Sequence, residues 1–255
     1  MIELRQDALV FSFPEVHKSA TLRLDFRRTL RIPNSTKAYP LPPGFENFPL
    51  KHVEDYEGRV PQEWITHGGI LMPMYQSEAM WINFKSEHND ERSTRYPFAV
   101  KIATGKVCAV SGEGWKDGFQ GDPQNYVVVP EQPWLDGYCV EEGVIRQFVA
   151  TPLGQGVSAE EQVTGKAEFG GVQIQVFPMK RDVYLKRFEK TPSDFGMHFM
   201  MEPPLCVSES GMGLAPGGRM RQEIYADPYD IDDWDTSITT RCFVHIANSM
   251  MWHTI

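Results

Sequence analysis

The segment from Gly143 to Lys180 reads GVIRQFVATPLGQGVSAEEQVTGKAEFGGVQIQVFPMK, and its order of strands and turns decides the fold class. Residues 144–151 (VIRQFVAT) are rich in β-branched and aromatic side chains with partial alternation, which predicts a strand that is covered on both faces. Pro152 lacks the N–H that a strand ladder needs, and therefore ends this strand. A glycine pair at 170–171 leads into VQIQVF, whose period of two is typical of a second strand.

A short helix is expected between these two strands. Ser158 and Glu161 have the spacing of a capping box, so the helix begins there and ends at Gly165. The glycines of the GQG turn at 154–156 precede the helix start, and a glycine-rich loop in that position can bind phosphate. However, the complete phosphate-binding motifs are absent, and Glu160 and Glu161 would repel an anion. We therefore favour a plain turn.

Alternating or β-branched runs recur along the chain and predict a mainly β protein with a few short helices. The expected architecture is a β-sandwich or a barrel-like pair of sheets, with an α+β fold as the second choice. We expect a single domain over 1–255 with long loops near 33–49 and 203–218, and the alternative is two subdomains, 1–95 and 96–255. The local predictions are a hairpin over 97–110, a helix over 180–190, and strands at 8–13, 21–32, within 69–84, at 125–130 and at 241–247.

The composition is that of an ordinary folded protein, with 41% apolar and 23% charged residues. A net charge of −9 disfavours a general nucleic-acid binder, which needs a basic face. No apolar run reaches the roughly 18 residues of a membrane helix, and the chain does not open on a signal-peptide pattern. The four cysteines contain no CxxC pair, which indicates reduced thiols and a cytoplasmic location; they are Cys108, Cys139, Cys206 and Cys242.

An acidic cluster, ADPYDIDDWD, spans residues 226–235. Carboxylates at alternating positions, such as Asp230, Asp232 and Asp235, are ligands that calcium prefers. The cluster lacks the central glycine and the terminal glutamate of a calcium loop, so we favour a solvated acidic turn with helix-capping aspartates and expect no metal or other cofactor. The histidines form none of the usual zinc-ligand pairs.

His245 is the strongest candidate for acid–base chemistry because it lies within the predicted strand RCFVHIA at 241–247. It would act as a general base if a carboxylate, such as Glu161, lay opposite, with Arg146 or Gln147 holding an anion or a carbonyl group. The commoner role for a histidine in such a strand is a hydrogen bond at the rim of the core. The chain contains no GxSxG motif and no cysteine beside an activating histidine.

Four phrases resemble a poorly characterised family of bacterial and fungal proteins: QNYVVVPEQPWLDGY, VIRQFVATPLGQGVSAEEQVTG, FGGVQI and RCFVHIANSMMW. The resemblance covers residues 125–252 and implies no particular activity, ligand or catalytic residue. Members of that family continue past the position of Trp252, so we expect this chain to be a shorter form or a trimmed domain.

Two hypotheses for the function remain. The favoured one is a ligand-binding or assembly module whose loops carry Gln132 and Trp134, with Arg146 and Gln147 nearby, and whose partner is another protein or a second copy of the chain. The alternative is a small-molecule enzyme of the hydrolase or lyase type that uses His245 and a carboxylate near an arginine. Polar residues inside apolar strands favour the enzyme, since burying them costs free energy unless they are paired or used.

Overall fold

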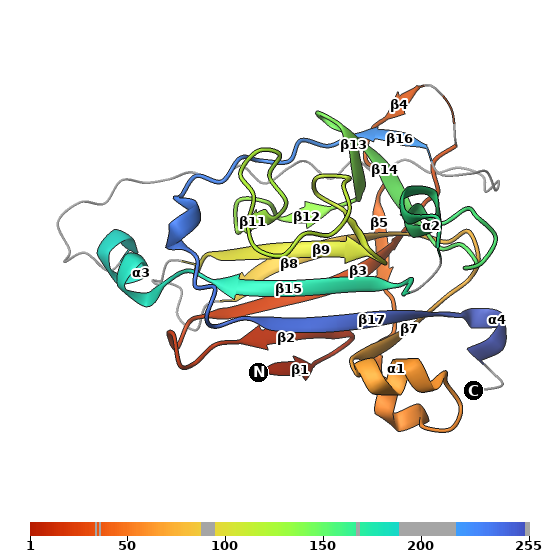
Figure 1. Ribbon diagram of the computed structural model, residues 1–255, viewed down its shortest axis with the longest axis horizontal. Helices are drawn as coiled ribbons and strands as arrows, with labels where there is room; N and C mark the ends of the chain where they lie inside the picture. Colours follow the sequence, from red (N-terminus) through yellow and green to blue (C-terminus); the bar gives the residue numbers. More distant parts are fainter. Residues whose placement is uncertain (34, 36, 88–94, 167–168, 189–217, 253–255) are drawn as a thin grey trace.

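The protein is built from two β-sheets, as the computed structural model shows for residues 1–33, 35, 37–87, 95–166, 169–188 and 218–252 (Figure 1). The prediction of a mainly β fold with a few short helices is confirmed. The predicted loop near 203–218 lies almost entirely outside the described residues, as does Cys206. No helix in the described ranges is long and apolar enough to cross a membrane.

The larger sheet has ten strands, and its main path runs β1-β2-β3-β8-β14-β16-β4. Three further strands pair at its sides: β5 with β3, β12 with β8 and β13 with β14. Most of the pairs are antiparallel, and β3 pairs with β8 over nine residues. The strands are β1 (Ile2–Leu4), β2 (Ala8–Ser12), β3 (Thr21–Thr29), β4 (Ala38–Tyr39), β5 (Gly44–Asn47), β8 (Ala79–Glu87), β12 (Trp134–Leu135), β13 (Gly137–Glu141), β14 (Val144–Val149) and β16 (Arg219–Arg221).

The smaller sheet has seven strands in the order β10-β9-β15-β17-β7-β6, with β11 paired to β9. β15 pairs with both β9 and β17 along its length, and β17 runs parallel to β7. The strands are β6 (Lys51–His52), β7 (Ile70–Met74), β9 (Phe98–Thr104), β10 (Val107–Cys108), β11 (Val127–Val129), β15 (Val172–Pro178) and β17 (Thr240–Asn248).

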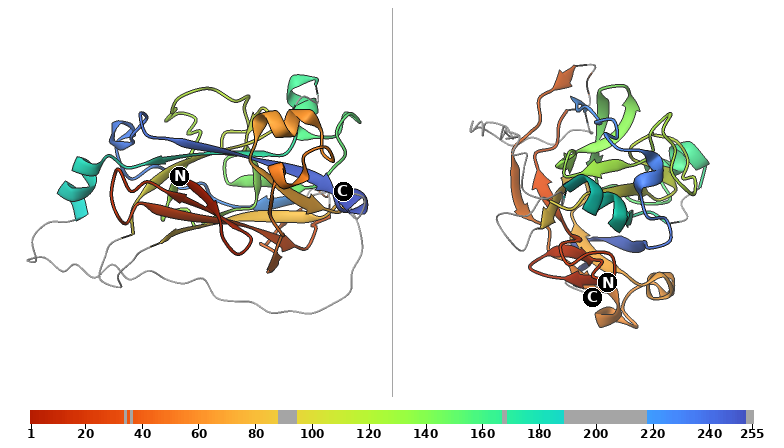
Figure 2. Two further views of the ribbon diagram at one scale, coloured as in Figure 1. Left: turned by 90° about the horizontal axis from the view of Figure 1, so that it is seen from below. Right: turned by 90° about the vertical axis from the view of Figure 1, so that its left-hand side faces the viewer.

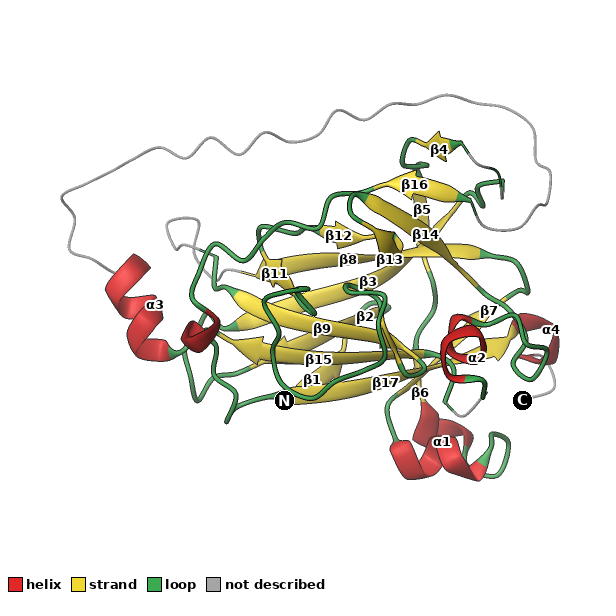
Figure 3. Cartoon of the chain, turned by 45° about the horizontal axis from the view of Figure 1, so that its top comes forward, coloured by secondary structure: helices red, strands yellow, loops and turns green. Residues whose placement is uncertain are grey.

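The helices are short and lie around the strands instead of between the sheets (Figure 3). The predicted helix over 180–190 is confirmed as α3, and the predicted hairpin over 97–110 is confirmed as β9 and β10. The segment 33–49, predicted as a loop, contributes the short strands β4 and β5. The helices are α1 (Gln62–His67), α2 (Ala159–Thr164), α3 (Arg181–Phe188) and α4 (Ser249–Trp252), with 3-10 turns η1 (Val53–Tyr56) and η2 (Ile231–Asp233).

The main hydrophobic core lies between the sheets and takes residues from both of them. In Figure 2 the red β2 and β3 lie in one layer, and the blue β17 and teal β15 lie in the other. In β15, Val172, Ile174 and Val176 are buried in this core, as the alternating pattern predicts. The core draws on both 1–95 and 96–255, while the division into subdomains stays a prediction.

All seven residues of β9 are buried because both faces of this strand are covered. One face contacts the core, and the glycine-rich loop of residues 111–124 covers the other. Lys101 attaches that loop to the strand, since its Nζ donates hydrogen bonds of 2.6 Å to the carbonyl oxygens of both Lys116 and Gly118. The loop is therefore held in place over the outer face of the smaller sheet.

Candidate functional site

The capping box predicted at the start of α2 is present in the structure. Ser158 Oγ donates to Glu161 Oε2 at 2.6 Å and accepts from Glu161 N at 3.3 Å, while the Glu161 carboxylate also accepts from the backbone of Ser158 and Gly156. The Ser158 hydroxyl, followed by the backbone donors, lowers the pKa of Glu161 to about 2. Glu161 is therefore an ionised surface cap that fixes the helix start.

The neighbouring carboxylate, Glu160, points to a different side of α2 and is 2% exposed. Successive helix residues diverge by about 100°, so the outward position of Glu161 turns Glu160 toward the sheets. Its Oε2 accepts hydrogen bonds from Gly170 N at 2.8 Å and from Phe169 N at 3.2 Å. Glu160 thus ties α2 to the turn that begins β15.

Gly105 leaves the space that the Glu160 side chain occupies. This glycine lies in the turn of the β9–β10 hairpin with a φ of +55°, and a Cβ added to it would approach the Glu160 carboxyl carbon to within 2.4 Å. Both the backbone conformation and the close approach require glycine.

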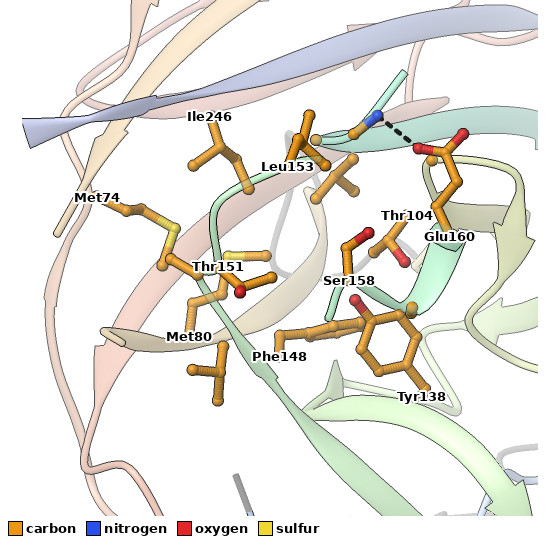
Figure 4. A pocket seen from close by; sticks show the side chains of 17 residues that line it. Met74, Met80, Thr104, Tyr138, Phe148, Thr151, Leu153, Ser158, Glu160 and Ile246 are labelled. Atoms are coloured by element: carbon orange, nitrogen blue, oxygen red, sulfur yellow. Dashed lines mark hydrogen bonds between the residues drawn. The ribbon is translucent and has the colours of Figure 1, made fainter. Parts of the chain in front are cut away.

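Glu160 lines a pocket of about 100 Å³ at the end of the core, where both sheets and α2 meet (Figure 4). One end of the pocket is mainly apolar, although Thr151 lies there beside Met74 and Met80, and the other end carries hydroxyl and carboxyl groups. The ten-stranded sheet contributes Met80, Tyr138 and Phe148, and the seven-stranded sheet contributes Met74, Thr104 and Ile246. The loop after β14 closes one side with Leu153, and α2 adds Ser158 and Glu160.

The Thr104 hydroxyl is buried in this pocket and has no hydrogen-bond partner of good geometry among the described residues. Burial raises the pKa of Tyr138, and its interaction with Thr104 offsets only part of that rise. Tyr138 therefore keeps its proton at neutral pH and can donate a hydrogen bond. The Thr104 hydroxyl therefore keeps hydrogen-bonding capacity that a bound polar group can use.

His245 lies on β17 and is not part of this pocket, and its side chain contacts α1 and the residue that follows it. Its Nε2 donates to Gly68 O at 2.9 Å, and its ring stacks on Trp64 with 5.0 Å between the ring centroids. Burial is the main cause that lowers the pKa of His245, and the nearby His67 adds to it. Of the two roles weighed for His245, these contacts match the hydrogen-bonded histidine at the rim of the core.

Arg146 and Gln147 lie on β14, next to the pocket residue Phe148. The Arg146 side chain is exposed, whereas Gln147 is buried and bonds to the backbone of 30–32. Its Nε2 donates to Leu30 O at 2.8 Å, and its Oε1 accepts from Ile32 N at 2.9 Å. The proposed trio of Arg146, Glu161 and His245 therefore sits in three different environments, and none of the three lines the pocket.

Gln132 and Trp134 also make structural contacts. Gln132 Nε2 donates to Trp134 O and Glu223 O, and its Oε1 accepts from Tyr225 N. The Trp134 ring packs edge-on against Trp81. Gln132 thus fixes the segment after β16 to the loop before β12, whereas the Trp134 ring packs within the larger sheet.

The acidic turn uses its carboxylates for local hydrogen bonds. Asp230 caps η2 and forms a capping box with Asp233. Asp235 Oδ1 accepts from the backbone and the hydroxyl of Ser237. Within the described part of the chain, no group of three or more His, Cys, Asp or Glu side chains is arranged to hold a metal ion.

Comparison with models of protein families, with curated proteins and with solved structures finds no match for this chain. The assignment of a candidate site therefore depends on the geometry of this structure alone. Sequence reasoning missed Thr104, Tyr138 and Glu160. One available signal was the capping box itself, because it directs Glu161 outward and hence Glu160 inward.

Proposed function

We propose that the protein is a binding module that holds a small, mainly apolar molecule with one hydrogen-bonding group in the pocket beside α2. The observation that carries this proposal is the buried Thr104 hydroxyl, which faces a pocket and has no partner of good geometry in the described residues. The sulfur and hydrocarbon groups of Met74, Met80 and Ile246 at the other end suit an alkyl chain.

The volume of the pocket limits the ligand. A cavity of about 150 Å³ accommodates benzene, and this pocket is smaller at about 100 Å³. A ligand of roughly five non-hydrogen atoms fits such a space, and at no more than about 1.5 kcal/mol per atom its Kd is micromolar at best. Binding must therefore be sought with millimolar ligand.

The polar end selects the head group. Thr104 and Tyr138 can both donate a hydrogen bond to a ligand oxygen, which an ammonium group does not offer. The Glu160 carboxylate attracts an ammonium group, but it already accepts hydrogen bonds from Phe169 N and Gly170 N, so we expect this attraction to be the weaker of the two effects. The Glu160 carboxylate would repel an anionic head group across a poorly solvated space. A short alcohol meets both conditions, since its hydroxyl accepts from Thr104 or Tyr138 and donates to the remaining lone pairs of Glu160.

The test is a titration with 1-butanol, followed by the NMR signals of the Met74, Met80 and Ile246 methyl groups, with 1-butylamine and butyrate as comparisons. We expect 1-butanol to shift these signals and to bind most tightly of the three. Thr104→Val keeps the shape of the side chain and removes its hydroxyl, and it should weaken 1-butanol binding about ten-fold while leaving xenon binding unchanged.

Thr66→Val, at an exposed threonine of α1, is the matched control and should leave both affinities as they are. The proposal fails if the methyl signals do not respond to 1-butanol, if Thr104→Val binds it as well as the parent protein, or if the amine or the acid binds more tightly.

A further inference from the structure

A groove of about 350 Å³ lies on the outer face of the seven-stranded sheet, separate from the pocket except for the backbone of Gly105. Its volume falls within the range of small-molecule sites, about 300–1,000 Å³. The side chains that line it are Lys106, Trp115, Phe169, Gln173, Arg241 and Phe243.

The strand register determines which side chains form the floor of the groove. Gln173 of β15 pairs with Phe243 of β17, and Arg241 lies two residues before Phe243 on the same face. The alternate residues Cys242 and Val244 point into the core, so the polar and aromatic side chains of β17 face outward. The Gln173 amide connects the β9–β10 turn to Arg241 of β17, since its Nε2 donates to Gly105 O at 2.8 Å and its Oε1 accepts from Arg241 Nη2.

Trp115 forms a wall of the groove and is held there by Lys101. The Lys101 ammonium group lies 4.3 Å from the centroid of the indole ring, and its bonds to the loop carbonyls fix the backbone on both sides of Asp117. A wall that is ordered before binding lowers the entropy cost of binding a ligand.

The groove combines aromatic rings with cations. Arg241 Cζ lies 5.0 Å from the Phe243 ring centroid and 5.5 Å from that of Trp115, and Lys106 Nζ lies 5.0 Å from that of Phe169. No described lining residue carries a carboxylate, although the net charge of the whole chain is −9. The Arg241 guanidinium has five N–H donors, so its contact with Gln173 leaves donors for a ligand.

We propose that this groove binds a planar aromatic anion, with the ring stacked on Trp115 or Phe169 and a carboxylate bound by Arg241 and Lys106. Aromatic rings stack favourably at centroid distances of about 4.5–7 Å, and arginine binds carboxylates through paired hydrogen bonds. A sugar, which also stacks on tryptophan, is disfavoured because it offers the Arg241 guanidinium no charged acceptor.

The test compares two probes of the same shape, 2-naphthoate and the neutral 2-naphthylmethanol, by isothermal titration calorimetry. We expect the anion to bind at least about ten-fold more tightly, which is the effect of one charge-assisted hydrogen bond. Arg241→Met should reduce this preference, with Lys106 left as the remaining cation, without weakening the neutral probe, and Trp115→Leu should weaken both probes.

The matched control is Arg221→Met, which removes an exposed arginine of β16 outside the groove and should change neither affinity. Thermal unfolding of each variant establishes that it is folded. Equal binding of the two probes, binding that survives Arg241→Met unchanged, or tighter binding of methyl β-glucoside would overturn the proposal. None of these outcomes depends on the alcohol pocket, so the two proposals stand or fall separately.

Discussion

Asp136 is a buried carboxyl group between β12 and β13. It is 2% exposed, and its Oδ2 has no hydrogen-bond partner in the described ranges of the chain. Burial raises its pKa from 3.8 to about 7, and a hydrogen bond involving Trp134 opposes only part of this rise. The folded protein therefore holds a proton on Asp136 under conditions in which the unfolded chain has released it.

The raised pKa of Asp136 predicts a pH-dependent stability. The protonated carboxyl group contributes stability that is fully present below the unfolded pKa, near 4, and is lost as the pH rises through the folded pKa, about 7. The Asp136→Asn variant has no titrating group at this position. Between about pH 5.5 and pH 7.5, the free energy of unfolding of the parent protein should therefore fall by about 2 kcal/mol relative to that of the variant. Urea unfolding at several pH values measures this change, and a constant difference between the two proteins would show that the pKa is not raised.

The roles of individual side chains are the property that is hardest to predict from the sequence. Gln132 is a predicted ligand-binding residue because it lies in a loop beside Trp134, and Gln147 is one because a polar group inside an apolar strand is either used or paired. Both are paired with backbone groups of segments about 90 or more residues away in the chain. A single sequence shows that such a residue is unusual, but it does not show which distant carbonyl or N–H group it meets.

Two local elements, the β9–β10 turn and α2, depend on each other through Gly105 and Glu160. A methyl group at Gly105 would collide with the Glu160 carboxyl, whereas one at Gly143, in the β13–β14 turn, would meet nothing within 4 Å. Both glycines have a positive φ, +55° and +69°, so both substitutions strain the backbone to a similar degree.

Gly105→Ala should therefore destabilise the protein more than Gly143→Ala does. We expect the control to cost about 1 kcal/mol for the backbone conformation and Gly105→Ala to cost about 1–3 kcal/mol more, because the carboxyl group must move. Glu160→Ala removes the collision, so in a double-mutant cycle the two changes should cost less together than the sum of their separate costs. Additive costs would mean that the methyl group of Gly105→Ala does not collide with the Glu160 side chain.

Local elements are where sequence reasoning succeeded. The period of two in VQIQVF predicts β15, the Ala-Thr-Gly sequence at 103–105 predicts the turn of the β9–β10 hairpin, and the Ser158–Glu161 spacing predicts the start of α2. Each of these signals lies within about ten residues of chain. The order of strands does not, since β17 lies between β7 and β15 through pairings over long sequence distances. The pocket and the groove arise from that order, so no local pattern predicted them.

At the scale of the whole molecule, the two proposed sites differ in which sheets they contact. The pocket is lined by both, through Phe148 on β14 and Ile246 on β17, whereas the groove lies over the seven-stranded sheet alone. A ligand that binds only the folded protein stabilises it by about 2.7 kcal/mol at 100 times its Kd. Local opening of whichever strands the ligand contacts then becomes rarer, and their amide hydrogens exchange more slowly.

Hydrogen exchange should therefore separate the two sites. We expect 1-butanol to slow exchange in β14 and in β17 together, because the ligand bridges the sheets, and we expect no such slowing in Thr104→Val. With 2-naphthoate, slowing should appear in β15, β17 and the loop of residues 111–124 and be absent from β14. Exchange measured by mass spectrometry on the intact chain resolves these segments. Slowing by 1-butanol in only one sheet would contradict a ligand that contacts both, and slowing by 2-naphthoate in β14 would contradict a groove on the outer face.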